Sequence, residues 1–355
     1  MLHVNERYVD ETRDEKGNVV DYQYKYPENF NFAYDVVDAI AEAEPGRRAM
    51  IWCNPCGEEH VFTYGDLKRY SDKTANMLRA KGIGKGDMVM VVLKRHYQFW
   101  FTILALHKLG AVIIPATFLL TKHDIVYRVN SASVKAVICT GQGDVAAHFD
   151  ESAPECPTLQ TKLMVNGERD GWEDFMTEME KAPESFARVP TLASDPMILY
   201  FSSGTTGNPK MALHPYTYAL GHLATAKYWH NVDPEGIHFT IADTGWGKAV
   251  WGKLYGQMFM ESCVFVYDFE KFVASDILDK VSQYGVTSLC CPPTMFRFFL
   301  QEDVKSWDLS RLTYCTIAGE ALSPDVFNKW YEATGIKLMD CLLYTSPSPR
   351  DYAAS

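Results

Sequence analysis

Two kinds of hydrophobic pattern alternate along the chain from residue 62 onward. In one, apolar residues recur at helical spacing, as they do between residues 67 and 78, just before Gly82. In the other, apolar residues run without interruption, as in MVMVVL from Met88, which predicts a strand buried on both faces. Helices that alternate with buried strands are typical of a mostly parallel sheet covered by helices. We therefore predict an α/β fold.

The alternation forms two series separated by a polar stretch. The first series contains the strand AVIIPA, a helix that Thr121 can cap with Asp124 completing a capping box, and the strand AVICTG. The stretch from Gly167 to Ser194 then carries acidic residues and prolines, which favour a boundary. We expect two layered αβα subdomains, residues 1–190 with an amino-terminal extension and residues 191–340.

The second series repeats the pattern with the strands MILYF, HFTIAD, CVFVY, VTSLCC and LTYCTIA. Trp251 and Tyr255 lie on the apolar stripe of a helix that follows HFTIAD, and we interpret both as core residues. A last helix should begin after Ser323 and end at Gly335.

Charge and cysteine content narrow the class of protein. The 355 residues carry a formal net charge of -11, so binding of nucleic acid through clustered Lys and Arg is not expected. The first residues are strongly charged and the apolar regions are interrupted by charges, so we expect no secretory signal, no membrane span and a cytoplasmic location. Nine cysteines favour reduced thiols, and Cys53 and Cys56 are interpreted as part of a turn. Small molecules are the expected partners.

The segment SSGTTGNPK has the composition of a phosphate-binding loop. It follows an apolar strand and precedes a segment that we expect to be helical. Gly204 and Gly207 allow the backbone to turn tightly and approach an anion, the hydroxyl side chains add donors, and Lys210 adds a positive charge. The segment is not a Walker A loop, which needs four residues between its glycines and a Gly-Lys-Ser/Thr ending.

This loop resembles the phosphate-binding signature of the adenylate-forming superfamily, which includes acyl-CoA synthetases, luciferases and the adenylation domains of peptide synthetases. Four further segments are similar to its medium-chain acyl-CoA synthetase branch: LALHKLGAVIIPAT, KMALH, TIADTGW and AGEALSP. The resemblance covers essentially residues 25 to 340.

The resemblance implies a reaction and a site. A fatty or short branched carboxylic acid would react with ATP to give an acyl-adenylate and pyrophosphate, and the acyl group would then pass to CoA. Thr205 would bind the Mg²⁺ that accompanies ATP, and Lys210 would act as the catalytic cation. Gly245 and Trp246 would line the acyl pocket, while Leu119 would lie near the CoA thiol in a loop spanning residues 117 to 120. The residues implied for ATP binding are Ser202, Ser203, Gly204, Thr205, Thr206, Gly207, Asn208, Pro209, Lys210, Gly319, Glu320, Ala321 and Asp340.

After Asp340 the chain departs from the pattern of the family. The family continues approximately as YGQTE, whereas this chain reads CLLYTSPSPRDYAAS, whose first part resembles a translated sequencing-library adapter. A natural Pro/Ser tail is the alternative. We expect residues 341–355 to be a non-native tail, and the distal barrel portion and mobile carboxy-terminal domain of the family to be missing.

Two alternatives stay open for the function. The parent enzyme could belong to another adenylating class, such as an aryl-CoA ligase or an amino-acid adenylation domain. The 355-residue chain could also be a nucleotide-binding fragment without turnover. We expect the chain by itself to be inactive, because several groups that the family aims at the transition state would be absent.

Overall fold

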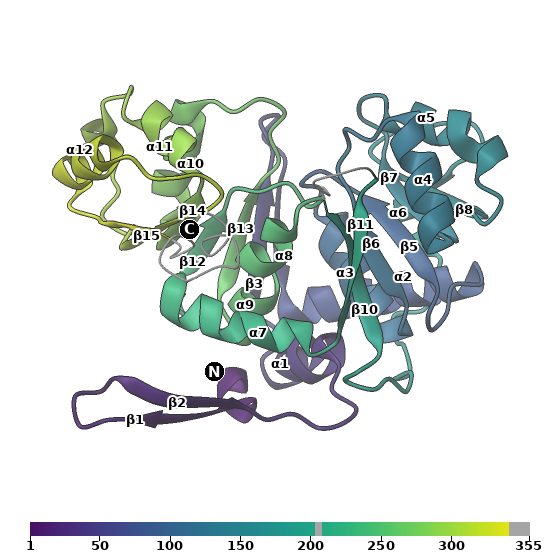
Figure 1. The fold of residues 1–355 in the computed structure, drawn as a ribbon, viewed down its shortest axis with the longest axis horizontal. Helices are drawn as coiled ribbons and strands as arrows, with labels where there is room; N and C mark the ends of the chain where they lie inside the picture. The colour runs from purple at the N-terminus through teal and green to yellow at the C-terminus, as the bar shows by residue number, and fades with distance from the viewer. Residues whose placement is uncertain (203–207, 341–355) are drawn as a thin grey trace, which may run out of the picture.

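The computed structural model describes residues 1–202 and 208–340. It contains two seven-stranded sheets and a separate hairpin made of β1 (Val9–Arg13) and β2 (Val19–Tyr24). The hairpin lies apart from both sheets, beneath the helices near the amino terminus (Figure 1). Helices cover the two sheets, which confirms the predicted α/β class.

The first sheet is parallel except at one edge, where β11 runs antiparallel to β10. Its strands lie in the order β11 (Lys210–Pro215), β10 (Pro196–Ser202), β6 (Val112–Pro115), β5 (Met88–Val92), β7 (Ala136–Thr140), β8 (Thr161–Val165) and β9 (Glu173–Asp174).

The second sheet is also parallel except at one edge, where β4 runs antiparallel to β3. Its strands lie in the order β16 (Leu338–Asp340), β15 (Tyr314–Ile317), β14 (Ser288–Cys291), β12 (Ile237–Thr240), β13 (Cys263–Tyr267), β3 (Arg48–Cys53) and β4 (Glu59–Thr63).

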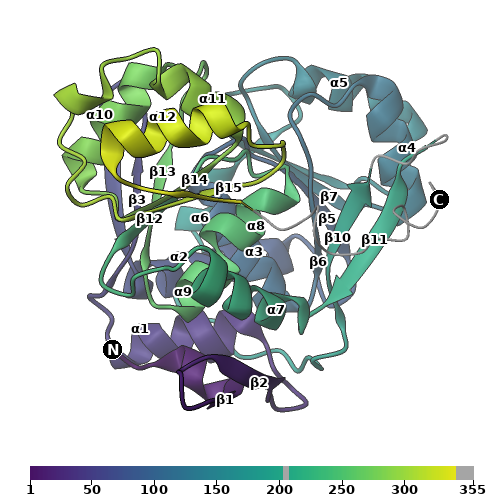
Figure 2. The same cartoon turned by 60° about the vertical axis from the view of Figure 1, so that its left-hand side comes forward.

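Alternating side chains of the strands enter different cores, since successive residues of a strand point to opposite faces. Val91 of β5 and Val264 of β13 share one large core that lies between the two sheets. Met90 packs in the core on the outer face of the first sheet, and Phe265 in the core on the outer face of the second. The two sheets therefore share a middle layer, as Figures 1 and 2 show.

Each layer of helices belongs to one of these cores. The middle layer is formed by α2 (Tyr64–Ala80) and α3 (Gln98–Leu109), with α1 (Ala39–Ala43), α6 (Phe175–Glu180), α7 (Tyr218–Ala224), α8 (Gly247–Lys253) and α9 (Tyr255–Phe259). The outer layers are formed by α4 (Lys122–Ala132) and α5 (Val145–Ser152) on the first sheet, and by α10 (Ala274–Tyr284), α11 (Pro293–Phe299) and α12 (Pro324–Thr334) on the second.

The local helix signals of the sequence are confirmed. Thr121 and Asp124 form a reciprocal capping box at the start of α4. The hydroxyl of Ser323 accepts a hydrogen bond from the third residue after it at the start of α12, and Gly335 ends this helix at a φ of 74°. A positive φ of this size favours glycine, which explains why the helix stops there.

The structure differs from the helix expected after the phosphate loop, and it leaves the expected subdomain boundary at residue 190 open. The phosphate loop does not lead into a helix: it joins β10 to the antiparallel strand β11, and the next helix begins only at Tyr218. The sheets also exchange strands across residue 190, because β3 and β4 join the second sheet while β10 and β11 join the first. The division into residues 1–190 and 191–340 therefore stays a prediction about folding units and does not describe the sheets.

Candidate active site

Four parallel strands of the second sheet, β12, β14, β15 and β16, end at the same edge. Gly245 and Trp246 follow β12, and the predicted adenine-binding residues 319–321 follow β15. Asp340 is the last residue of β16 and pairs with Ile317 at the end of β15. Ligands of open α/β sheets bind outside the carboxyl ends of the strands, so the topology gathers these predicted residues where a ligand is expected.

A cavity of about 440 Å³ lies at this edge. It brings Trp246, predicted for the acyl pocket, together with Gly319, predicted for adenine. Trp251 also lines it, so the interpretation of this residue as core is wrong, whereas Tyr255 is fully buried as expected. The lining residues are Arg95, Ile241, Ala242, Asp243, Trp246, Lys248, Trp251, Met295, Ala318 and Gly319.

Gly245 has no room for a side chain. A Cβ atom there would lie 2.5 Å from the carbonyl carbon and oxygen of Ala116 and 2.6 Å from the nitrogen of Thr117. The turn around it is fixed locally, since the Gly245 N–H donates to Oδ1 of Asp243 at 2.8 Å and the Trp246 N–H donates to the Asp243 carbonyl at 3.1 Å. Gly245 therefore brings the turn predicted to bind the acyl group against the segment that follows β6.

That segment continues into the loop predicted to lie near CoA. Leu119 is 69% exposed, and its N–H donates to the hydroxyl of Thr117 at 3.3 Å. Leu120, in contrast, is buried in the outer core of the first sheet. The loop is anchored at both ends while Leu119 points into solvent, and it lies beside the turn that carries Trp246.

The charged groups in the cavity wall were missed by the sequence analysis. The ammonium of Lys248 is buried and has no hydrogen-bond partner among the described residues, and the same holds for Oδ2 of Asp243. Arg95 donates from Nη1 to the Phe269 carbonyl at 3.0 Å and stacks on that ring at 4.2 Å. A lysine on an otherwise apolar helix face was the one available signal for Lys248.

Lys253, at the end of α8, supports the wall from behind. Its side chain is buried, and its ammonium donates to the Ala242 carbonyl at 2.6 Å. Burial lowers the pKa of Lys253 to about 7, because the charged form loses its hydration. The backbone next to Asp243 is therefore held by a donor that has no contact with solvent.

Three residues predicted for ATP binding, Glu320, Ala321 and Asp340, are not among the residues that line the cavity. Glu320 and Ala321 are exposed, and Glu320 accepts a hydrogen bond from the Thr294 N–H at 3.2 Å and another from the Thr294 hydroxyl. Asp340 is exposed at the sheet edge. Gly319 has a φ of 100° and open space where a Cβ atom would lie, so the chain can follow a ligand closely there.

The phosphate loop is a hairpin of which only part is described. Ser202 pairs with Lys210, and the Ser202 hydroxyl donates to the Lys210 carbonyl at 3.3 Å. The hydroxyl of Tyr127 donates to the Pro209 carbonyl at 2.9 Å, which anchors the hairpin to α4, while Asn208 and Lys210 are exposed. The predicted ligands Ser203, Gly204, Thr205, Thr206 and Gly207 lie outside the described residues.

One contact links this hairpin to the cavity. Tyr200, two residues before the loop, lies with its ring 3.9 Å from where a Cβ atom of Gly247 would be. Gly247 stands between Trp246 and Lys248 at the start of α8. The strand that leads into the predicted phosphate loop therefore packs beside the start of α8, although neither Ser202 nor Lys210 lines the cavity itself.

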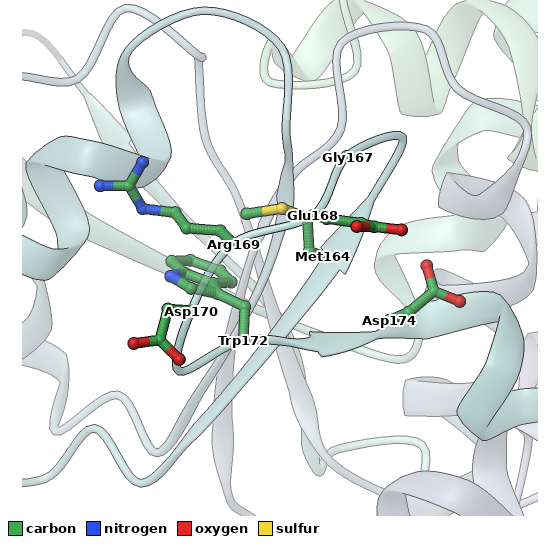
Figure 3. Close-up of a pocket in the computed structure, with 7 residues that line it drawn as sticks. All are labelled: Met164, Gly167, Glu168, Arg169, Asp170, Trp172 and Asp174. Atoms are coloured by element: carbon green, nitrogen blue, oxygen red, sulfur yellow. The ribbon is translucent and has the colours of Figure 1, made fainter.

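A second cavity, of about 390 Å³, lies at the far edge of the first sheet between β8 and β9. Figure 3 shows three carboxylates around it, those of Glu168, Asp170 and Asp174. Arg169, the cation in its wall, already pairs with Asp150. Carboxylates repel a triphosphate, so this cavity is a poor site for ATP.

The described residues contain no group of three or more His, Cys, Asp or Glu side chains that could hold a metal ion. Mg²⁺ commonly keeps water and substrate phosphate oxygens as ligands and needs few protein groups. An ion that enters with ATP is therefore compatible with this chain, and Thr205 stays the predicted ligand.

Comparison with known proteins identifies relatives along most of the chain. Rat acyl-coenzyme A synthetase ACSM4, mitochondrial (Rattus norvegicus), is 36% identical over 322 residues, which are 88% of this chain and 55% of that protein. Human acyl-coenzyme A synthetase ACSM5, mitochondrial (Homo sapiens), is 37% identical over 322 residues, again 88% of this chain and 55% of that protein. The chain thus spans about half the length of the curated relatives it matches.

The relatives also bear on location. Their names place them in mitochondria, whereas a cytoplasmic location was expected here, and that location stays a prediction. No helix within residues 1–202 and 208–340 has the length and apolar character needed to cross a bilayer.

Solved structures and a family model complete the comparison. The anthranilate CoA ligase AuaEII in complex with anthranoyl-AMP superposes with a TM-score of 0.79 at 21% identity, covering 88% of this chain and 60% of that one. An acyl-CoA synthetase from Brucella canis superposes with a TM-score of 0.78 at 22% identity, covering 87% and 56%. The family model described as AMP-binding enzyme matches residues 37–342. The chain therefore belongs to the AMP-binding enzymes, the adenylate-forming superfamily that includes the acyl-CoA synthetases.

Proposed function

We propose that the protein containing this chain is an AMP-forming acyl-CoA synthetase for short, medium-chain or branched carboxylic acids. In the first step a carboxylate oxygen attacks the α-phosphorus of ATP, and the bond to pyrophosphate breaks. In the second step the CoA sulfur attacks the acyl carbonyl, the thiol proton is lost, and AMP leaves. The partners are small molecules: the acid, ATP and CoA.

A single observation carries the proposal: one cavity holds Trp246, Lys248 and Gly319 at the carboxyl edge of a parallel sheet. Lys248 offers a buried positive charge without a described partner, which suits an anionic group such as the carboxylate. Gly319 lets the backbone approach a flat ring. Because Gly245 presses this wall against the loop of Leu119, the acyl and CoA sides would adjoin.

The residues of the hairpin would bind the triphosphate. Lys210 and Asn208 are accessible to an anion because both are exposed, and Ser202 lies at the base of the loop. Mg²⁺, when bound with ATP, would neutralise phosphate charge. The protein's own task is mainly to orient the carboxylate and to place positive charge where negative charge develops.

An aryl-CoA ligase is the alternative that one observation favours. Trp246 and Trp251 both line the cavity, and indole faces also suit an aromatic acid. An amino-acid adenylation domain stays possible on family grounds alone. A panel of straight, branched and aromatic acids and amino acids, assayed on the full-length protein, separates these three readings.

The decisive test uses the full-length protein with ATP, Mg²⁺, CoA and the acid panel. Acid-dependent pyrophosphate release together with a CoA thioester is the expected result, and its absence with every acid contradicts the proposal. Lys248→Met should raise the KM for the acid roughly ten- to a hundredfold, since hydrogen bonds to charged groups contribute about 1.5–3 kcal/mol. Lys135→Met is the matched control, because Lys135 pairs with Asp87 at the amino ends of β5 and β7 and does not line the cavity.

We further propose that the 355-residue chain does not complete the reaction by itself. This proposal rests on the fact that the chain spans about half of its relatives. Comparing the chain with the full-length protein in the same assay tests it, and equal thioester formation by both contradicts it.

A further inference from the structure

Lys94 follows β5 at the carboxyl edge of the first sheet in an unusual conformation. Its φ is 44°, in the left-handed region that residues with a side chain seldom adopt. The side chain is only 7% exposed, so its neighbours cover nearly all of it. A conformation of this kind persists where the surroundings hold it, and it often marks a functional site.

The surroundings of Lys94 come from four other strands. Its carbonyl accepts a hydrogen bond from the Thr244 N–H, after β12, at 2.8 Å. Its ammonium donates to the two carboxylate oxygens of Glu270, after β13, at 2.8 and 3.0 Å, and to Oε1 of Gln142, after β7, at 3.1 Å. The same ammonium lies 5.0 Å from the ring centre of Phe118, after β6.

The next two residues extend this connection between the sheets. Arg95 donates to the Phe269 carbonyl at 3.0 Å, and Nδ1 of His96 lies 2.6 Å from Oδ2 of Asp268. Residues 94–96 of the first sheet are therefore joined to residues 268–270 of the second along their whole length. Lys94 also contacts the loop that contains Leu119, through Phe118.

The geometry points to Lys94 as a positioning residue that holds the CoA-side loop, through Phe118, at a fixed distance from the acyl-side turn, through Thr244. This inference rests on the proposed function. Thr244 directly precedes Gly245 and Trp246, and Phe118 directly precedes Leu119, so a shift of Lys94 alters the separation of the two walls. Transfer of the acyl group to the thiol requires both walls, whereas formation of the adenylate requires the acyl wall and ATP.

The two half-reactions therefore distinguish positioning from simple support of the fold. In the full-length protein, Lys94→Met keeps the apolar stem and removes the charge. Misplacement of reacting groups by about 1 Å can cost on the order of a hundredfold, so we expect transfer from preformed acyl-adenylate to CoA to slow tenfold or more. Adenylate formation, followed as ATP–pyrophosphate exchange, should stay within about threefold, the spread expected of a contact outside that step.

Two further variants complete the test. Lys94→Arg should recover part of the transfer rate, because the guanidinium can reach Glu270 and stack on Phe118. Lys135→Met should change neither half-reaction. If Lys94→Met fails to fold, Glu270→Gln serves in its place. The Glu270 side chain is 70% exposed, and removing its charge leaves the hydrogen bond between the Thr244 N–H and the Lys94 carbonyl intact.

Equal losses in both half-reactions, or no loss in either with a folded variant, would overturn the role of Lys94. Such results leave the proposed function standing, because the wild-type protein still forms adenylate and thioester. If the wild-type protein showed no acid-dependent ATP–pyrophosphate exchange, that result would instead contradict the proposed function. The KM for CoA, measured alongside, should rise in Lys94→Met while the KM for ATP does not.

Discussion

The predicted phosphate hairpin and the cavity beside α8 each carry a lysine, but in opposite settings. In the hairpin, Asn208 and Lys210 are exposed and the anchoring contacts come from Ser202 and Tyr127. In the cavity, the ammonium of Lys248 is buried and has no hydrogen-bond partner among the described residues, and Gly245 is pressed against neighbouring backbone. A loop free of packing demands can display its chemistry openly in sequence. A pocket wall must also pack, so its functional residues look like core.

The largest expected effect is on the exposed side of this comparison. Lys210→Ala in the full-length protein should lower the rate of pyrophosphate formation by roughly a hundred- to a thousandfold, the usual cost of losing one group aimed at the transition state. The melting temperature should stay unchanged, because Lys210 is exposed. A variant with normal adenylation would remove the hairpin lysine from the mechanism, and a lowered melting temperature would mean that the hairpin carries packing after all.

Gly245→Ala should differ from Lys210→Ala, because it should lower the stability of the protein as well as its activity. The added Cβ atom would meet the Ala116 carbonyl at 2.5 Å, and overpacking of this kind costs about 1–3 kcal/mol. Urea unfolding measures the loss. Gly221→Ala is the control, since nothing lies within 4 Å of a Cβ atom there and the position is helical. Unfolding of Gly245→Ala at the wild-type urea concentration would show that the wall yields easily.

The smallest expected effect concerns stability at acid pH. It arises from His107, which is buried in the middle layer, and involves no residue of the hairpin. Burial lowers the pKa of His107 to about 3, whereas it is about 6.5 in the unfolded chain. The unfolded state therefore takes up a proton first, and stability falls as the pH drops from about 6.5 toward 3. At pH 5 this single group accounts for about 2 kcal/mol.

His107→Phe should therefore reduce the loss of unfolding free energy between pH 7.5 and pH 5 by about 2 kcal/mol, measured by urea titration at both values. Other groups titrate in the same range. His222, with a pKa lowered to about 4, acts in the same direction, while burial raises the pKa of Asp38 to about 6 and opposes it. The comparison of variant with wild type cancels both. An unchanged pH dependence would place the acid sensitivity elsewhere.

Local signals in the sequence predicted local structure well. The capping box of Thr121 and Asp124 and the ends of α12 are set by residues that lie within one turn of one another. The strand after the phosphate loop could not be predicted in this way. KMALHP is short, and its pairing with β10 rather than a helical period decides its conformation.

The same contrast between local signals and distant contacts applies to the candidate site. Trp246 and Gly319 could be predicted as site residues because their motifs resemble those of a family, and both line one cavity. Lys248 and Arg95 could not, since the residues that line the cavity with them come from segments distant in sequence. The conformation of Lys94 likewise depends on contacts after four strands that are distant in sequence.

The position of β3 has a consequence for synthesis of the protein. This strand pairs with β13, with Met50 opposite Val264, so its parallel partner emerges from the ribosome some two hundred residues later. At about 5–20 residues per second, the delay is on the order of ten to forty seconds. β4 pairs with one edge of β3 at once, through a short turn. The other edge has to wait, and during that interval the nascent chain presents an unpaired, strongly apolar strand to chaperones and to neighbouring chains.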